Sequence, residues 1–256
     1  PLENRYNREF MPFTAAHPAI ILPLLRRRWF SVTALVMGSM APDFEYFFRL
    51  RTRSEISHSL PGLLLFNLPV ALLLSLLFHT TVRDLVIQYL PPYFRQRALA
   101  VNYPANWLQY LRRNWLMLSV SAVVGAFSHL FWDNFTHDQT SATSVLPILL
   151  TTVELPVLGQ IELTRIVQHL STLVGLAFIL WYVHLLPSKP NYSVPRQPWL
   201  RFWISIFVAG FAFVLLNLLV RNHLHEVFKH FVVTLISGWL LALLFTGLAF
   251  KLRQQA

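Results

Sequence analysis

Long apolar runs separated by short polar connections dominate the pattern along this chain. A helix needs about 20 mostly apolar residues to cross roughly 30 Å of hydrocarbon. Five runs have close to that length, namely 61–78, 115–132, 166–186, 202–220 and 231–250. Pro69 interrupts the first run and predicts a kink, whose freed backbone groups neighbouring helices can satisfy. The pattern therefore predicts five full transmembrane helices.

Two shorter apolar segments, 15–25 and 31–42, come before the first span. Each is too short to cross a bilayer, and three consecutive arginines, Arg26 to Arg28, separate them. This pattern predicts a helical hairpin that enters the membrane part-way. The run 144–153 is also short, and we expect it to be interfacial or re-entrant.

Composition supports a membrane fold rather than a soluble one. Of the 256 residues, 55% are hydrophobic and 12% are charged, whereas soluble domains carry about 25% charged residues. We predict an all-α, polytopic integral membrane helical bundle, with one domain over residues 11–256. The polar tail 1–10 lacks the apolar core of a signal peptide. The chain has no cysteine, which excludes a disulfide framework and a thiolate metal site.

The net charge of +10 is distributed in short clusters between the apolar runs. Such clusters are topology signals, and we expect no nucleic-acid partner. The connection 79–114 holds five arginines and one acid, while the connection 133–165 holds four acids and one base. The positive-inside rule predicts that the first connection and the C-terminus are cytoplasmic and that the second connection faces outward. Three arginines at positions 49, 51 and 53 run against this assignment.

A few ionisable residues lie at the ends of the apolar runs. Such residues are costly beside a membrane and mark functional sites. His129 and Asp133 are four residues apart, so they lie on one face of a helix and can bind one ion. His137 lies eight residues from His129, about 12 Å along a helix. We expect His137 to serve a second ion or a substrate.

Connectivity brings further candidates to the same place. The span that starts after His58 crosses away from it, and the next span returns and ends near His129 and Asp133. Asp43 precedes His58 by fifteen residues, and the predicted hairpin would place His17 beside Asp43. We therefore predict a metal site made of His17, Asp43, His58, His129 and Asp133. Histidine and carboxylate ligands suit zinc, with iron or manganese as alternatives, and the set is large enough for one or two ions.

Other interpretations of these residues compete with a metal site. A lone histidine in a membrane helix is more often a buried hydrogen-bonding residue, and an aspartate at a helix end is often a cap. A Ser/His/Asp triad can also be drawn with Ser57, Ser59 or Ser128, although serines are common in such helices. The convergence of five candidate ligands favours the metal interpretation.

The remaining histidines are weaker candidates. His79 lies about 30 Å along a helix from His58, which excludes it from the cluster. His169 and His184 fit the ends of a span. His223, His225 and His230 form a polar connection and stay as minor alternatives.

Four ordered motifs carry a family resemblance: Met11 to Ala19, Gly38 to Tyr46, Ser57 to Gly62 and Ser128 to His137. With them the chain resembles, from Met11 onward, the bacterial "domain of unknown function 4184" family, which implies no established activity. The chain is more distantly similar to bacterial inner-membrane proteins described as metal-dependent hydrolases. That likeness implies a cytoplasmic-membrane location and a hydrolytic metal site. Glu45 stands here where those proteins have a second Asp, and Ser57 stands where Thr is usual. The His-x-x-x-Asp helix is also similar, as a motif only, to zinc-dependent phospholipase C and single-strand nucleases.

We expect a membrane-embedded metal-dependent hydrolase that acts on a phosphoester or lipid-like substrate near the outward face. Glu45 or His137 would move the proton. The basic residues Arg49, Arg51 and Arg53 would receive an anionic headgroup, and membrane lipids are the expected partners.

The alternative is a non-enzymatic scaffold or a small transporter, in which the same residues form a structural metal site or an ion path. A structural site is closed by four protein ligands, whereas a catalytic site keeps a position for water. A transporter would show interrupted spans in two related halves, and the sequence contains no such repeat.

Overall fold

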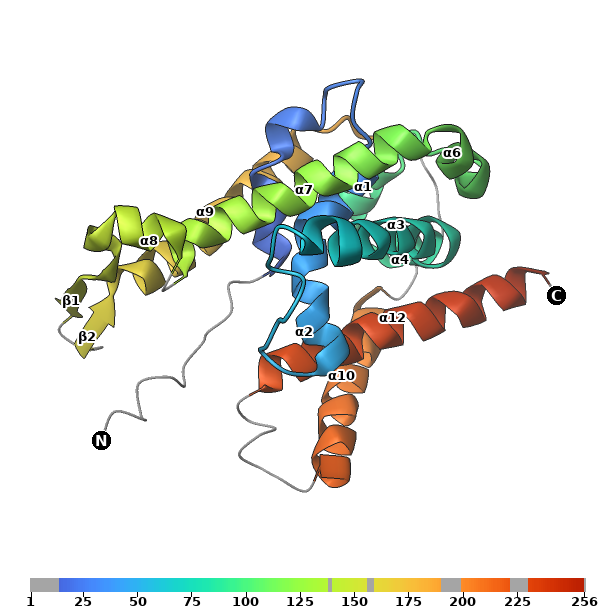
Figure 1. The fold of residues 1–256 in the computed structure, drawn as a ribbon. Coiled ribbons are helices and arrows are strands. Elements are labelled where there is room, and N and C mark those ends of the chain that lie inside the picture. Colours follow the sequence, from blue (N-terminus) through green and yellow to red (C-terminus); the bar gives the residue numbers. More distant parts are fainter. Residues whose placement is uncertain (1–13, 138–139, 156–158, 190–198, 222–229, 256) are drawn as a thin grey trace. The chain divides into compact units, whose positions relative to one another are not determined.

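The computed structural model describes residues 14–137, 140–155, 159–189, 199–221 and 230–255. Five helices in these ranges are long and apolar enough to cross a membrane: Leu63–Tyr89, Trp115–Thr136, Leu163–His184, Trp199–Val220 and Phe231–Gln254. The predicted all-α fold with five spans is therefore confirmed, and the chain is a multi-pass membrane protein (Figure 1). The expected tail 1–10, the first three residues of the earliest motif, His223 and His225 lie outside the described residues.

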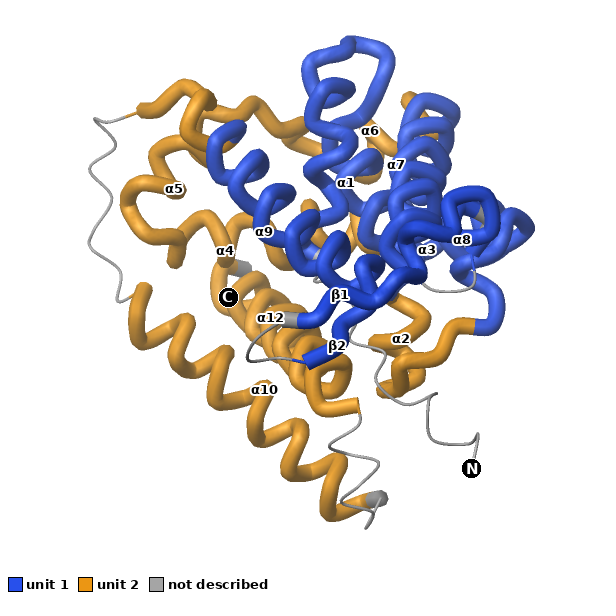
Figure 2. The backbone as a smooth tube through the Cα atoms, turned by 90° about the vertical axis from the view of Figure 1, so that its left-hand side faces the viewer, with its two compact units in different colours: residues 1–43, 55–72, 116–182 blue, residues 44–54, 73–115, 183–256 orange. Residues whose placement is uncertain are grey.

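The chain divides into two compact units (Figure 2). Unit 1 comprises residues 1–43, 55–72 and 116–182. Unit 2 comprises residues 44–54, 73–115 and 183–256.

The first span is longer than predicted. It consists of η4 (Leu63–Asn67), α3 (Leu68–Leu77), η5 (Phe78–Val82) and α4 (Arg83–Tyr89). η4 and η5 are wide π-helical turns, and η4 comes directly before Pro69, where a regular turn would lose a hydrogen bond. The helix runs past Phe78 because polar residues can continue a helix after the apolar run ends.

Short helices form the N-terminal part of unit 1. These are η1 (Thr14–Ala19), η2 (Leu22–Leu24), α1 (Val32–Met40) and η3 (Ala41–Asp43). The first arm of the predicted hairpin is 3₁₀ rather than α-helical, since Pro18 and Pro23 remove backbone donors from it. Ser31 caps α1, accepting a hydrogen bond from the backbone N–H of Ala34 at 3.4 Å. Part-way entry of this hairpin into a membrane stays a prediction.

Two glycines bring α1 into backbone contact with α7 (Trp115–Thr136). A Cβ atom on Gly38 would clash with the carbonyl oxygen of Ala122, and one on Gly125 would clash with that of Leu35. Neither position can therefore hold a larger residue without moving a helix. Small residues allow this close packing between helices in membranes, and here the packing sets the register of α1 against α7.

The connection from α7 to α9 (Leu163–His184) contains more structure than predicted. It includes α8 (Ser141–Val145), η6 (Pro147–Leu150) and a two-stranded antiparallel hairpin of β1 (Thr152–Leu155) and β2 (Gly159–Glu162). Gly159 has a φ of +72°, which glycine adopts without steric cost. The short run 144–153 is thus divided among three elements.

Unit 2 contains α2 (Phe44–Arg49), α5 (Pro92–Ala98), α6 (Trp107–Arg113), α10 (Trp199–Arg221) and α12 (Phe231–Gln255). α10 packs on α12 where Gly210 and Gly238 approach each other. α2 is tied to α12 because the Ser237 hydroxyl donates to the backbone carbonyl of Phe47 at 3.0 Å.

Candidate metal centre

The last two turns of α7 supply the centre of the site. His129 and Asp133 lie one turn apart, and the His129 Nε2 atom is 3.1 Å from Asp133 Oδ2. His129 is fully buried and Asp133 is 8% exposed. The predicted pairing of these two residues on one helical face is therefore present.

The backbone of α1 fixes the orientation of His129. Its Nδ1 atom is 2.8 Å from the backbone carbonyl oxygen of Ser39. Since a carbonyl can only accept, Nδ1 is the donor and carries the proton. The other ring nitrogen, Nε2, then points its lone pair at the carboxylates when the ring is neutral. Hydrogen bonding of one ring nitrogen to a carbonyl is the usual way that metal-binding histidines are held.

Asp43 reaches the same place from η3. Its Oδ1 atom lies 3.5 Å from His129 Nε2 and 3.6 Å from His58 Nε2. Its second oxygen, Oδ2, is buried and has no hydrogen-bond partner among the described residues. Burial acts to raise the pKa of the Asp43 carboxyl, but the neighbouring His129 and His58 outweigh burial and hold that pKa below its ordinary value.

The tight turn before the first span positions His58. The Ser57 hydroxyl lies 2.9 Å from His58 Nδ1, and the Asn67 side-chain amide donates to the Ser57 carbonyl at 2.8 Å. His58 Nε2 is left facing the carboxylates, 3.5 Å from Asp133 Oδ2. Burial acts to lower the pKa of His58, but hydrogen bonding to Asp133 and Asp43 raises it overall.

His17 completes the cluster from η1. Its Nε2 atom lies 3.2 Å from Asp133 Oδ1, and its ring stacks on that of His129 with centroids 3.8 Å apart. Its side chain is almost fully buried. The five residues predicted as metal ligands therefore converge within unit 1, from η1, η3, the turn before η4, and α7.

These ligand atoms have the spacing of a coordination shell. Two overlapping groups, His17–Asp43–His129 and His58–His129–Asp133, each offer ligand atoms within 4.8 Å of one another. Neighbouring ligands of a tetrahedral zinc ion with bonds of about 2.0–2.1 Å lie about 3.4 Å apart. The nitrogen–oxygen separations between the histidines and aspartates of the two groups run from 3.1 to 3.6 Å. Asp43 Oδ2 and His129 Nε2 are buried without hydrogen bonds, which fits atoms suited to a cation.

His137 lies at the border of this cluster. Its backbone N–H donates to the Asp133 carbonyl at 3.0 Å, as in a helical turn, and its Nδ1 atom lies 3.2 Å from that carbonyl oxygen and 3.7 Å from Asp133 Oδ1. Its side chain is 36% exposed. His137 therefore lies beside Asp133, one turn further along the chain, and its predicted catalytic role stays a prediction.

The other predicted functional residues belong to unit 2. Glu45 is buried and its Oε1 atom accepts a hydrogen bond from Arg49 Nε at 2.9 Å, with the Arg49 Nη2 atom also 2.9 Å away as an ion pair. Arg51 and Arg53 are exposed. The proton-transfer role of Glu45 and the headgroup role of the three arginines remain predictions.

The serine-triad interpretation gains little from the structure. Ser57 contacts His58, but its side chain is fully buried and contacts Nδ1, the nitrogen that points away from the carboxylates. The hydroxyls of Ser59 and Ser128 donate to backbone carbonyls of Ile56 and Gly125. Ser57 is therefore better described as the residue that orients His58.

Sequence reasoning missed two supporting groups, the Ser39 carbonyl and the Asn67 amide. Asn67 left a signal, since it is the only amide side chain within the apolar run 61–78. The Ser39 carbonyl left none, because backbone atoms have no sequence signature.

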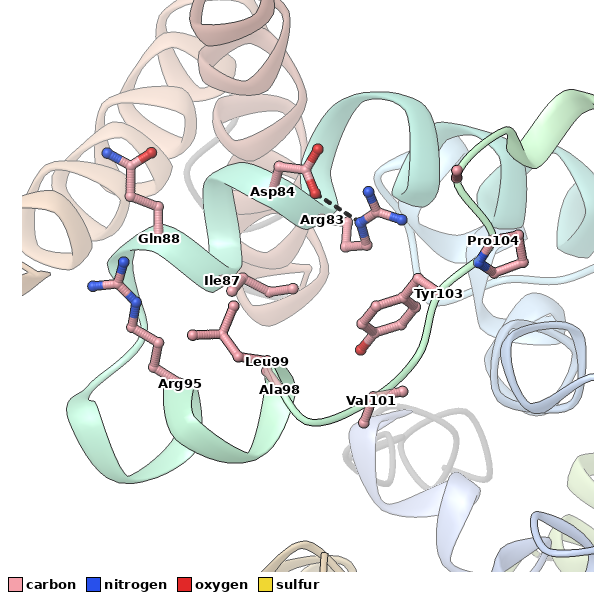
Figure 3. A pocket seen from close by; sticks show the side chains of 11 residues that line it. Arg83, Asp84, Ile87, Gln88, Arg95, Ala98, Leu99, Val101, Tyr103 and Pro104 are labelled. Atoms are coloured by element: carbon pink, nitrogen blue, oxygen red, sulfur yellow. Dashed lines mark hydrogen bonds and ion pairs between the residues drawn. The ribbon is translucent and has the colours of Figure 1, made fainter. Parts of the chain in front are cut away.

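A cavity of about 460 Å³ lies in unit 2 (Figure 3). Arg83 donates to Asp84 at 2.7 Å beside it and lies over the Tyr103 ring. Burial raises the pKa of Tyr103, so its hydroxyl stays protonated at neutral pH. Gln88 and Arg95 line another part of the cavity. No histidine lines this cavity, so its chemistry differs from that of the cluster.

Comparison with known proteins yields a family and no characterised relative. Neither the curated proteins nor the solved structures contain a match to this chain. The model of the family described as "Domain of unknown function (DUF4184)" matches residues 11–248, so the chain belongs to that family.

Proposed function

We propose that this protein is a membrane-embedded metal-dependent hydrolase that acts on a phosphoester or lipid-like substrate. One observation carries the proposal: two buried carboxylates and three imidazoles converge at coordination distances within unit 1. Two buried acids need positive charge beside them, because an unpaired buried charge is costly.

The charge balance of the cluster favours a divalent ion. Asp43 and Asp133 contribute two negative charges, which neutral imidazoles leave uncompensated. Protonation of His17 and His58 supplies part of the balance without metal, but the Nε2 atom of His129 makes no hydrogen bond with acceptable geometry in the described structure. A dication satisfies both carboxylates and the lone pairs of all three rings at once.

The orientation of His129 favours one ion rather than two. Its Nδ1 atom donates to Ser39, so only Nε2 is available as a ligand. The two overlapping groups both need that nitrogen. We therefore propose a single ion, with zinc as the best match to nitrogen and carboxylate ligands and manganese or iron as alternatives.

The exposed flank of the cluster favours catalysis over a closed structural site. His58 and His137 have side chains 21% and 36% exposed, whereas His129 is fully buried. A bound divalent ion supplies activation of water and polarisation of the scissile group. On the exposed flank, His137 is placed beside Asp133 to accept or deliver a proton at its ring nitrogen. A phosphoester of an amphiphile is the substrate class that a metal site in a five-span protein would meet.

The first test is metal analysis of detergent-purified protein. We expect about one zinc ion per chain in the wild type, and loss of the metal in His129→Ala and Asp133→Ala. His184→Ala is the matched control, because His184 is bonded to Tyr93 in unit 2. Equal metal content in all four proteins would end the proposal.

The second test is hydrolysis of phosphatidylethanolamine and of generic phosphodiesters. We expect activity that is lost with a chelator and in Asp133→Ala. If metal is retained but activity is absent, and cobalt substitution gives a four-coordinate spectrum without water, the site is structural and the protein is a scaffold rather than an enzyme.

A further inference from the structure

A cavity of about 400 Å³ borders the metal centre inside unit 1. One wall is formed by η1, through Ala16, His17 and Ala19, and the other wall is α9 from Val167 to Phe178, with Trp132 of α7 also contributing. His17 belongs to the cavity lining and also contacts Asp133. The cavity and the metal cluster therefore share a residue.

The cavity has the polarity of a hydrocarbon site. Its lining is mostly apolar, and the two hydroxyls on its α9 wall are already satisfied. Ser171 and Thr172 both donate to the backbone carbonyl of Gln168 on their own helix, at 2.9 and 3.0 Å. No hydroxyl proton on this wall is left for a polar ligand, so its surface suits an alkyl chain.

Its length matches one leaflet of a bilayer. From Val167 to Phe178 α9 advances about 16 Å, which is roughly half of the 30 Å hydrocarbon core. The volume is at the low end of the range for small-molecule sites, enough for one chain. Leu170, Val174 and Phe178 line the cavity and are each about half exposed, so it opens along a membrane-spanning helix.

We propose that this cavity holds one acyl chain of a membrane lipid whose polar headgroup lies at the metal centre. The apolar wall and the charged cluster meet at His17, which is the polarity pattern of an amphiphile. The identity of the headgroup chemistry rests on the proposed hydrolase function, but the acyl-chain site itself does not. A second copy of this chain is the competing occupant, and the test below separates the two.

Photocrosslinking tests the acyl-chain site. The full chain is placed in phosphatidylcholine bilayers that contain a small fraction of phosphatidylethanolamine with a diazirine near the end of one acyl chain. We expect adducts to be concentrated on residues 16–20 and 167–178. Val174→Trp should reduce them by about tenfold by filling the cavity.

Leu173→Trp is the matched control. Leu173 is the neighbouring residue on α9, is 65% exposed and does not line the cavity, so its replacement should leave the adducts unchanged. Equal labelling of Leu173, Leu180 and the lining residues, or adducts that persist in Val174→Trp, would overturn the proposal. Protein dimers trapped by a separate protein-reactive crosslinker, with no lipid adducts on the lining residues, would assign the cavity to a second copy and overturn it as well.

Metal content and chain-length preference separate this proposal from the hydrolase. We expect Val174→Trp to keep its metal and to raise KM for a long-chain phosphodiester about tenfold, with KM for a short-chain one unchanged. Localised adducts in a protein without metal would leave the acyl-chain site standing and remove the hydrolase. A protein that binds metal and hydrolyses the substrate but is labelled uniformly by the lipid would keep the hydrolase and remove the acyl-chain site.

Discussion

Histidines in the two units have different partners. In unit 2, His79 stacks on Trp107 at 3.6 Å, His184 is bonded to the Tyr93 hydroxyl, and His230 accepts from the backbone N–H of Thr52. In unit 1, His17, His58 and His129 instead direct their Nε2 atoms at carboxylate oxygens. Histidines thus make packing and hydrogen-bond contacts in unit 2, whereas in unit 1 they form a cluster with two carboxylates.

The acids of the two units differ in the same way. In unit 2, Glu45 is paired with Arg49, and Asp84 is paired with Arg83. A guanidinium carries a permanent charge, so these acids are balanced at every pH of interest. In unit 1, Asp43 and Asp133 have histidines as neighbours, and a neutral imidazole offers them a lone pair rather than a charge.

This difference distinguishes an acid that is already paired within the protein from an acid that could bind a metal ion. Buried acids next to arginine need nothing further, whereas buried acids next to neutral histidine need a cation from outside the chain. A cluster of histidine and carboxylate is thus more informative about metal binding than the number of histidines alone. The predictions below exploit this contrast between the two units.

Metal removal should have the largest effect. A ligand present at a thousand times its Kd stabilises a protein by about 4 kcal/mol, so a chelator should lower the melting temperature of the wild type markedly. His230→Ala should keep this chelator response, because His230 is outside the cluster. His129→Ala should lose it. Thermal unfolding in detergent with and without chelator measures all three, and an unresponsive wild type would contradict the prediction.

The fold was largely predictable because its signal is redundant. Each span repeats the same apolar composition over some twenty residues, so no single residue decides it. Boundaries were less predictable: the first helix continues to Tyr89 through polar residues such as Thr80 and Arg83, which hydrophobicity alone assigns to a connection.

The cluster was predictable from connectivity, since two consecutive spans must return His129 to the side of His58. The contact of His137 with Asp133 also follows the four-residue spacing on α7. The division into two units had no sequence signal. The pairing of Glu45 with Arg49 had no sequence signal either, because each side chain could equally have bonded to another residue.

Asp133→Asn should have the next largest effect, and its size should depend on metal. With zinc present the variant loses a ligand and the stabilisation that the ion provides. With a chelator present it loses only the contacts that histidines such as His17 and His58 make with the carboxylate, so a smaller loss of about 1–3 kcal/mol is expected. Asp84→Asn in unit 2 is the control, since Asp84 is exposed and paired with Arg83. Thermal unfolding under both conditions measures the effect, and equal losses with zinc and with chelator would contradict a metal role.

Ser57→Ala should weaken metal binding about tenfold, or about 1.4 kcal/mol, as is typical when a group that orients a metal-bound histidine is removed. The Ser57 hydroxyl fixes His58 Nδ1, so the metal should be retained but exchange faster. Ser128→Ala is the control, because the Ser128 hydroxyl donates to the Gly125 carbonyl of its own helix. Competition with a chromophoric chelator measures both affinities, and equal values would show that Ser57 does not orient a ligand.

Glu45→Gln should have the smallest effect and is the sharpest test of the contrast between units. It replaces the charged partner of Arg49, whose side chain is 38% exposed, so we expect a loss of about 1 kcal/mol or less. Metal content and zinc affinity should be unchanged, because the five proposed ligands lie in unit 1. If catalysis is found, a fall in kcat with unaltered metal affinity would assign Glu45 the proton-transfer role predicted from the sequence. Loss of metal from Glu45→Gln would instead make Glu45 a ligand, and the division between arginine-paired and histidine-paired acids would fail at the first acid that follows Asp43.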